Sequence, residues 1–329
     1  MKKMRAACIP ASLLAAFCIG FASAEANAQA RGYPIKPVRM IVPFSPGGSA
    51  DNLARTMQPG LNAVLGQAVV LDNRPGASSI IGTDLVKQAP PDGYTLLLVT
   101  TTHTVTPSLI KKLPFDPLKD FSGVSLVVSQ PNILVIHPSV SAKSVKELVA
   151  LGKSGKINLT FASGGNGSSP HLSGELLKLI TGIDATHVPY KGSGPGVAAL
   201  LGGQVTMMFA GPLALEAHIK SGKLRALAIA DKNRTSLLPD LPTMAEAGFA
   251  GVETGTWYAI LAPAGTPQAI IDKLQAAIVT VLSEQEMKAR LLAQGVDIVG
   301  STPRELDAMM REEVQKWAKL VKQAGIVLN

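Results

Sequence analysis

The sequence VRMIVPFSPGGSADNLARTMQ, residues 38–58, joins an apolar run to an amphipathic segment through a loop that contains two glycines. The run 38–42 predicts a strand because it is short, apolar and contains β-branched residues. Residues 51–65 predict a helix, since their apolar side chains recur at helical spacing. A strand that leads through a short loop into a helix is the building unit of open parallel sheets, where ligands bind beyond the carboxyl ends of the strands.

The same unit recurs along the rest of the chain. Further strands are predicted at 68–71, 95–99, 133–137, 159–162, 185–189, 205–209, 224–230 and 256–262. Further helices are predicted at 79–88, 144–152, 171–181, 195–201, 212–221, 267–282, 284–294 and 303–324. This alternation predicts an α/β protein in which mostly parallel sheets are flanked by helices.

The chain divides most economically into two α/β domains. Residues 131–254 carry a strand–helix series of their own, whereas the helices that follow have too few strands to form a further domain. We therefore expect one domain of residues 31–130 plus 255–329, and a second of residues 131–254. Segments near 129–131 and 251–256 are expected to join them. Two lobes on a double connection can close around a ligand in the cleft between them.

The first thirty residues have the layout of a secretory signal peptide. Lys2, Lys3 and Arg5 form a positive segment, an apolar run follows at 9–24, and the small residues of 28–30 fit a cleavage site. Cleavage is predicted after Ala30, and we expect the mature protein to be exported.

The composition narrows the class of protein. The chain has 329 residues, 47% of them hydrophobic and 16% charged, which excludes intrinsic disorder. Both cysteines, Cys8 and Cys18, lie in the predicted leader, and Phe17 before Cys18 argues against lipidation. Loss of the leader lowers the formal net charge from +8 to +6, with no basic stripe that would suit a nucleic acid. We expect a monomer.

Four loops after predicted strands supply neutral hydrogen-bond donors with little side-chain bulk, at 43–51, 100–104, 163–171 and 210–212. Glycines let backbone amides approach a ligand, and a helix N-terminus carries free N–H groups and the positive end of the helix dipole. Such a terminus suits a carboxylate or a phosphate. The candidate ligand-binding residues are Phe44, Ser45, Gly47, Gly48, Ser49, Thr101, Thr102, His103, Ser163, Gly165, Asn166, Ser168, Ser169, Ala210 and Gly211.

Some residues in these loops also fit a structural role. We expect Asp51 to act mainly as a helix cap, and the glycine loop before it also fits a plain turn. The lone His103 suits a structural role as well as ligand contact, and His171 suits the first turn of a helix. The loop 190–195 precedes another predicted helix and also fits the wall of the cleft. Its Lys191 is the one cation near these loops, and we expect it on the solvated surface.

Signatures of enzymes and metal sites are missing from the sequence. It contains no Walker phosphate loop, no dinucleotide-binding glycine pattern, no nucleophile elbow and no zinc-protease motif. The five histidines are scattered singly, and the mature chain has no thiol nucleophile. We therefore expect no catalytic residue, no metal and no cofactor.

A series of motifs, in order along almost the whole mature chain, resembles the Bug proteins, which are periplasmic receptors of the tripartite tricarboxylate transporter family. The motifs are VPFSPGGSAD (42–51, then Arg55), NRPGA (73–77), PDGYTL (91–96), FASGGNGS (161–168), HVPYKG (187–192), LGGQV (201–205), LPDLPT (238–243) and APAGTP (262–267). Together these motifs are highly specific, although each alone is weak.

This resemblance implies a two-lobed Venus-flytrap receptor with a type II periplasmic binding protein fold. It implies that loop amides and ordered water hold a ligand carboxylate, and that the receptor delivers it to membrane permease subunits. Ser45 stands where many relatives have proline, and Ser78 and Ser79 stand where many have glycine. The Ser45 change adds a hydroxyl group near the expected cleft.

The leading hypothesis is thus a periplasmic receptor for a small organic carboxylate. Two alternatives from other classes stay open: a secreted hydrolase or isomerase that uses the same cleft, and a ligand sensor that addresses a membrane kinase.

Overall fold

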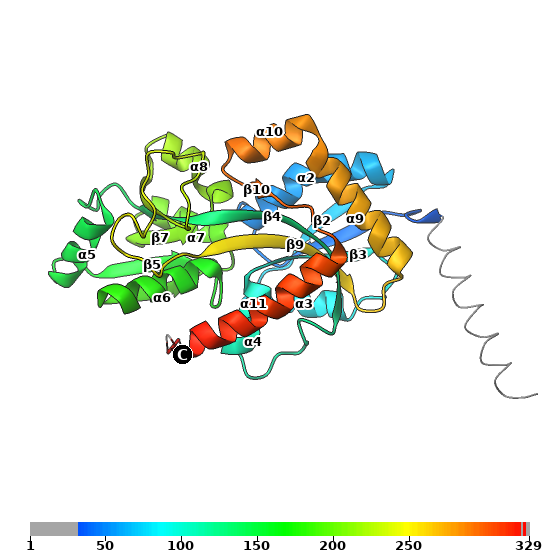
Figure 1. Cartoon of the computed structure of the whole chain (residues 1–329), viewed down its shortest axis with the longest axis horizontal. Helices are drawn as coiled ribbons and strands as arrows, with labels where there is room; N and C mark the ends of the chain where they lie inside the picture. Colours follow the sequence, from blue (N-terminus) through cyan, green and yellow to red (C-terminus); the bar gives the residue numbers. More distant parts are fainter. Residues whose placement is uncertain (1–31, 324, 327–329) are drawn as a thin grey trace, which may run out of the picture.

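A mixed sheet of ten strands runs through the molecule, with helices on both of its faces (Figure 1). The computed structural model describes residues 32–323, 325 and 326. The predicted leader, residues 1–30, and its cleavage site after Ala30 lie outside the described residues. In Figure 1, α2, α9 and α10 lie above the sheet, and α3, α4, α6 and α11 lie below it.

The first half of the fold contains three parallel strands, with β1 between β2 and β3. Its elements are β1 (Val38–Val42), α2 (Ser49–Leu65), β2 (Val69–Asn73), α3 (Ile80–Lys87), β3 (Thr95–Thr100) and α4 (Thr102–Leu109). The apolar face of α2 buries Leu53, Met57 and Leu61 against this sheet. Fully burying one such side chain stabilises the fold by about 2 kcal/mol.

Two long strands connect the halves of the sheet. They are β4 (Phe121–Ile136) and β9 (Gly255–Pro263). The two pair antiparallel from Phe121 to Pro131, and the end of β4 then pairs antiparallel with β7 and β8. The backbone therefore crosses from one half to the other within a hydrogen-bonded sheet.

The second half repeats the strand–helix alternation. Its elements are α5 (Val145–Lys153), β5 (Leu159–Ser163), α6 (Ser169–Thr181), β6 (Ala185–Pro189), α7 (Ser193–Leu201), β7 (Met207–Ala210), α8 (Pro212–Lys220) and β8 (Arg225–Ala230). β5 pairs in parallel with β6 and β7. Gly174 in α6 lets this helix approach β5, because an added Cβ there would lie 2.2 Å from the Phe161 ring.

The last part of the chain returns to the first half. It comprises α9 (Gln268–Ser283), α10 (Gln285–Ala293), β10 (Asp297–Ile298) and α11 (Pro303–Gln323). α9 packs against α2, and α11 packs against α4 and β4. The division into 31–130 plus 255–329 and 131–254 stays a prediction.

The structure corrects the sequence-based elements at two main places. Residues 129–131, predicted as a connection, lie inside β4, which begins at Phe121 rather than Ile133. Bulges near Gly123 and Leu126 interrupt the alternation of apolar residues, and Pro131 argues against a strand by sequence alone. Residues 102–104, predicted as loop, begin α4, because packing against α11 overrides the weak helix propensity of threonine.

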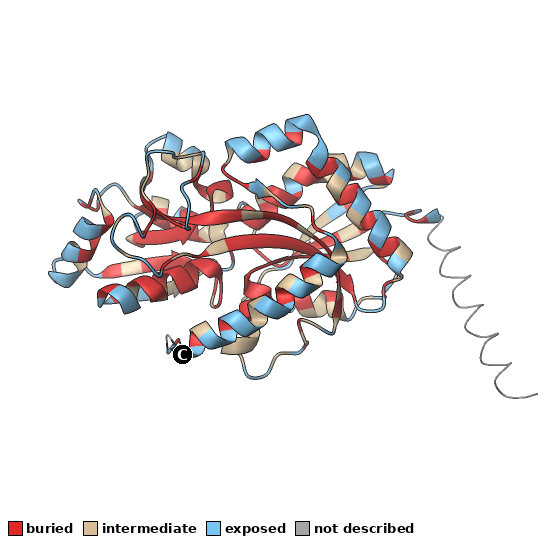
Figure 2. Ribbon diagram, viewed as in Figure 1, coloured by how far each residue is buried: buried red, intermediate tan, exposed pale blue. Residues whose placement is uncertain are grey.

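Burial follows the layers. Figure 2 shows the strands mostly buried and the outward faces of α9, α10 and α11 exposed. No helix among residues 32–323 is long and apolar enough to cross a membrane.

Candidate ligand-binding site

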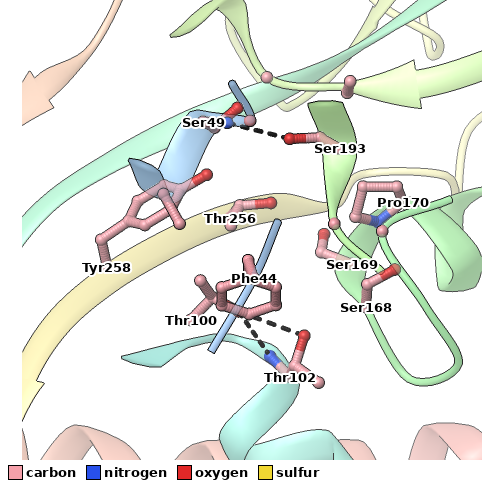
Figure 3. Close-up of a pocket in the computed structure, with 16 residues that line it drawn as sticks. Phe44, Ser49, Thr100, Thr102, Ser168, Ser169, Pro170, Ser193, Thr256 and Tyr258 are labelled. Carbon is pink, nitrogen blue, oxygen red and sulfur yellow. Dashed lines mark hydrogen bonds between the residues drawn. The ribbon is translucent and has the colours of Figure 1, made fainter. Parts of the chain in front are cut away.

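A pocket opens where loops from both halves of the sheet meet. Most of its lining consists of small or hydroxyl-bearing residues, and Figure 3 shows their side chains around the cavity. The lining residues are Phe44, Gly48, Ser49, Ala50, Thr100, Thr102, Gly164, Ser168, Ser169, Pro170, Gly192, Ser193, Ala210, Gly211, Thr256 and Tyr258. None of these described residues carries a charged side chain.

Five helices begin at this pocket. The residues that precede their first turns are Gly48 for α2, Thr101 for α4, Ser168 for α6, Gly192 for α7 and Gly211 for α8. At each helix the pocket lining includes the preceding residue or the first helical residue. The first amides of a helix have no partner within it and carry the positive end of its dipole. Their convergence makes the pocket electropositive without a cationic side chain.

Ser49 links two of these helices. Its amide donates a hydrogen bond of 2.9 Å to Ser193 Oγ, so the N-terminus of α2 meets that of α7 (Figure 3). Its own hydroxyl is buried and makes no hydrogen bond within the described residues, although it lies near the Tyr258 hydroxyl. An unsatisfied buried hydroxyl beside a cavity is available to a ligand.

Tyr258 is held as a neutral donor. Gln130 Nε2 donates to the Tyr258 hydroxyl at 2.6 Å, and Gln130 Oε1 accepts a hydrogen bond from the Leu213 amide. Burial raises the pKa of Tyr258 above its ordinary value. The phenol therefore keeps its proton and can act as a hydrogen-bond donor.

The two halves touch directly around the pocket. The Ser45 amide donates to the Lys191 carbonyl at 2.7 Å, and Asn52 Nδ2 donates to the Leu213 carbonyl at 2.8 Å. A Cβ on Gly194 would lie 2.9 Å from the Gly48 amide nitrogen. Only glycine permits this approach, and the contacts hold loops of the two halves against each other.

The buried side-chain amide of Asn132 sets the position of α6 relative to β9. Asn132 Nδ2 donates to Ser169 Oγ at 2.7 Å, and Asn132 Oδ1 accepts from Thr256 Oγ1 at 3.2 Å. Ser169 Oγ also donates to the Gly255 carbonyl at 2.7 Å. Asn132, which does not itself line the pocket, thus orients two lining residues, Ser169 and Thr256.

Asp51 stabilises the first loop in a way that differs from the predicted cap. Gly48, not Asp51, precedes the helix, and the Asp51 carboxylate accepts hydrogen bonds from the Gly47 amide at 2.9 Å and Arg55 Nε at 2.8 Å. Asn73 Nδ2 donates to its other oxygen. Burial opposes ionisation, but these bonds outweigh it and lower the pKa of Asp51.

The structure gathers eight of the fifteen predicted residues at the pocket: Phe44, Gly48, Ser49, Thr102, Ser168, Ser169, Ala210 and Gly211. Gly165 and Asn166 line an adjacent cavity instead. The other five predicted residues, Ser45, Gly47, Thr101, His103 and Ser163, line neither cavity.

Local bonds explain most of these departures. His103 points into the core, where Nε2 lies 3.1 Å from the Pro117 carbonyl and burial lowers its pKa to about 4. Ser163 Oγ bonds to His187 Nε2 at 2.7 Å, and Thr101 Oγ1 accepts a hydrogen bond from the Trp257 amide.

Sequence reasoning missed part of the lining. Thr256 and Tyr258 lie on β9, a strand that comes late in the chain, and no loop motif marks them. Ser193 lies in the loop 190–195, which the sequence also indicated as part of the cleft, and it lines the pocket with Gly192. Among the described residues, no three His, Cys, Asp or Glu side chains gather as metal ligands would.

Comparison with known proteins agrees with this architecture. The sequence model of a protein family described as "Tripartite tricarboxylate transporter family receptor" matches residues 53–326 of this chain. The chain is 40% identical over 313 residues to the protein BugT of Bordetella pertussis, covering 94% of this chain and 96% of that protein.

Solved structures extend the likeness to the fold. The periplasmic binding protein BugD superimposes with a TM-score of 0.87 at 36% identity, covering 90% of this chain and 99% of that one. R. palustris Rpa4515, solved with adipate, superimposes with a TM-score of 0.86 at 34% identity and the same coverage. These matches confirm the expected two-lobed α/β fold of periplasmic binding proteins. The chain belongs to the receptor family of the tripartite tricarboxylate transporters.

Proposed function

We propose that this protein binds a small organic carboxylate in the pocket between its two halves and delivers it to the permease of a tripartite tricarboxylate transporter. The permease partner and the carboxylate are part of this proposal, as are the ligand-contacting roles of the lining residues.

One observation carries the proposal: helix N-termini converge on a pocket whose described lining has no charged side chain. An anion gains from each free amide and each dipole end, and hydrogen bonds to an ionised acceptor are about twice as strong as neutral ones. A cation meets only positive dipole ends there. A carboxylate is small enough for a pocket built from glycine, serine and threonine.

The relatives support the same ligand class. The Rpa4515 structure contains adipate, a dicarboxylate, and its fold matches this chain across 90% of its length. The described lining of the pocket also lacks histidine, carboxylate and cysteine side chains, which are the commonest catalytic bases, acids and thiols of hydrolases and isomerases.

Native mass spectrometry of the mature protein tests the proposal directly. We expect the mass spectrum to show a co-purifying organic acid. If none is retained, we expect the thermal unfolding temperature to rise when aliphatic carboxylates from succinate to suberate are added. Failure of every carboxylate to bind contradicts the ligand class. Turnover of a bound carboxylate that is lost in Ser168→Ala favours an enzyme instead.

A further inference from the structure

A pair of stacked imidazole rings lies beside a loop that forms part of the pocket. His171, in the first turn of α6, and His187, in β6, have ring centroids 4.1 Å apart. The loop 163–168 connects β5 to α6 and supplies Gly164 and Ser168 to the pocket lining. Neither histidine lines the pocket itself, so any effect of these rings on a ligand acts through the loop.

His171 holds this loop through one ring nitrogen. The Gly167 amide donates a hydrogen bond of 3.1 Å to His171 Nδ1. Because an amide nitrogen can only donate, Nδ1 must carry a lone pair, and the proton of the neutral ring lies on Nε2. A second proton on the ring would place two N–H groups against each other and break this bond. The loop therefore keeps its anchor only while His171 is neutral.

Gly167 is also the contact of this loop with the first half of the fold. A Cβ on Gly167 would lie 3.0 Å from Leu109 Cδ1 and 3.5 Å from Val105 Cγ1, both on α4. Thr102, at the start of α4, lines the pocket together with Ser168. A shift of the loop at Gly167 would therefore alter both the pocket wall and the contact between the two halves.

The burial of His171 depends on residues of the first half. The side chain is 3% exposed, and the next residue, Leu172, packs in one cluster with Val105 of α4 and Trp317 of α11. Ile326, which follows α11, lines the same groove as His171. Separation of the two halves would remove these neighbours and admit water to the ring. The charged form of His171 is then less disfavoured, because its desolvation is relieved.

The charged and titratable groups around His171 come from α6 and β6. Glu175 Oε1 lies 4.0 Å from His171 Nε2, and Lys178 Nζ lies 3.1 Å from the other Glu175 oxygen. Asp184, in the turn before β6, and His187 line the same groove. From α4, α11 and β5, apolar side chains face this region. Burial lowers the pKa of His171 to about 4, and the Lys178 charge adds to the effect.

We propose that His171 is a positioning residue of the pocket, which holds the loop 163–168 in place for the ligand while it is neutral and releases the loop when it takes up a proton. The inference rests on the proposed function, because it needs a ligand in the pocket of helix N-termini. Proton and ligand then oppose each other: ligand binding expels the proton, and acid weakens ligand binding to the same degree.

The size of the effect follows from the linkage between protonation and closure. A histidine whose pKa is about 6.5 in the open protein and about 4 in the closed protein weakens ligand binding about tenfold between pH 7.5 and pH 5.5. His187 differs, because its Nε2 lies 2.7 Å from Ser163 Oγ. A hydroxyl accepts a hydrogen bond from a charged ring as well as donating one to a neutral ring, so this contact survives protonation.

Isothermal titration of the mature protein at pH 7.5 and pH 5.5 tests this inference, with the tightest-binding dicarboxylate from succinate to suberate. His171→Asn keeps an oxygen acceptor for the Gly167 amide but does not titrate in this range. We expect this variant to bind within about twofold of the parent protein at pH 7.5 and to lose the tenfold weakening at pH 5.5. Protonation of the ligand itself affects both proteins equally and cancels in the comparison.

Two further variants separate the acceptor from the proton. His171→Leu leaves the Gly167 amide without its acceptor, so it should weaken binding about fivefold at pH 7.5. His218→Asn removes a histidine from the last turn of α8, outside the pocket lining, and should keep the pH dependence of the parent protein.

Proton counting gives a test that needs no variant. Titration of the parent protein at pH 5.5 in two buffers of different ionisation enthalpy measures the protons released on binding. We expect close to one proton more than the ligand itself loses, because His171 is protonated in the open protein and neutral in the closed one.

The outcomes distinguish the two proposals. An equal pH dependence in the parent protein and His171→Asn, or release of no proton beyond those of the ligand, overturns the role of His171 and leaves carboxylate binding in place. Absence of binding for every carboxylate at pH 7.5 overturns the proposed function together with this inference.

Discussion

The amide of Ser49 donates a hydrogen bond of 2.9 Å to the hydroxyl of Ser193, although 144 residues separate them in the chain. The bond joins the first turn of α2 to the first turn of α7. It occupies an amide at the place where a ligand oxygen is expected to bind. The Ser193 hydroxyl therefore acts as an internal acceptor that helps to hold the two halves together.

Removing this acceptor should favour separation of the halves in the unliganded protein. Ser193→Ala deletes one hydrogen bond, worth about 1 kcal/mol, which corresponds to roughly a fivefold shift in the ratio of closed to open molecules. Small-angle X-ray scattering should then give a larger radius of gyration than for the unaltered protein. Ser221→Ala, which removes an exposed hydroxyl at the end of α8, is the control. Identical scattering for both variants and the parent protein contradicts this role of Ser193.

Two neighbouring glycines should respond to alanine in different ways. A Cβ on Gly48 would lie 2.8 Å from Ser193 Oγ and 2.9 Å from the Gly194 nitrogen, so Gly48→Ala should hinder closure and weaken carboxylate binding at least about tenfold. A Cβ on Gly47 meets nothing within 4 Å, but its φ of 79° disfavours alanine. Gly47→Ala should therefore cost about 1 kcal/mol of stability.

Titration calorimetry and urea unfolding distinguish these effects. An unchanged affinity in Gly48→Ala shows that ligand binding does not need the contact between α2 and α7.

The sequence predicted the strand–helix units well where the pattern of apolar residues within the element itself specifies it. The strand 38–42 and the strand 185–189 have the same bounds in the structure, because short apolar runs between turn residues specify them locally. The start of β4 was missed, since its bulges and Pro131 conceal a strand that pairs with residues more than a hundred positions later.

The pocket was predictable only in part for a similar reason. Gly48, Ser49, Ser168 and Ser169 stand at helix starts, which local sequence reveals. Tyr258 depends on the packing of β9 beside Gln130, and no local pattern encodes that contact. Other loop residues, such as Thr101 and His103, were predicted to contact the ligand but do not line the pocket. The sequence does not show on which side of a loop a side chain points.

Packing of α6 onto the sheet gives a prediction about the fold alone. Gly174→Ala would place a Cβ 2.2 Å from the buried Phe161 ring, and overpacking of this kind typically costs about 1–3 kcal/mol. Urea unfolding should show that loss. Gly202→Ala, whose Cβ has no contact closer than 3.4 Å, should change stability by less than about 0.5 kcal/mol. Equal effects of the two variants contradict the α6 packing described here.

Buried histidines should make the protein less stable in acid. Burial lowers the pKa of His171 to about 4 and that of His187 to about 3, with further contributions from Lys178 and, for His187, from His171. Between pH 6.5 and about 4 the unfolded chain takes up protons that the folded protein does not. Stability therefore falls with decreasing pH, by up to about 1.4 kcal/mol per pH unit for each histidine.

Urea unfolding near pH 7 and near pH 5 measures this dependence. The double variant His171→Gln/His187→Gln should depend less steeply on pH than the unaltered protein, because two of the titrating groups are gone. An equally steep dependence in the double variant shows that these two histidines do not account for the loss.

The most direct test of the account compares a carboxylate with its neutral carboxamide in titration calorimetry of the mature protein. The two molecules have nearly the same shape, but only the carboxylate gains from the dipole ends of α2, α4, α6, α7 and α8. For the tightest-binding carboxylate, we predict that the carboxamide binds at least about a hundredfold more weakly, a difference of about 2.7 kcal/mol. Equal affinities for the two would contradict the central claim that converging helix N-termini make this pocket an anion site.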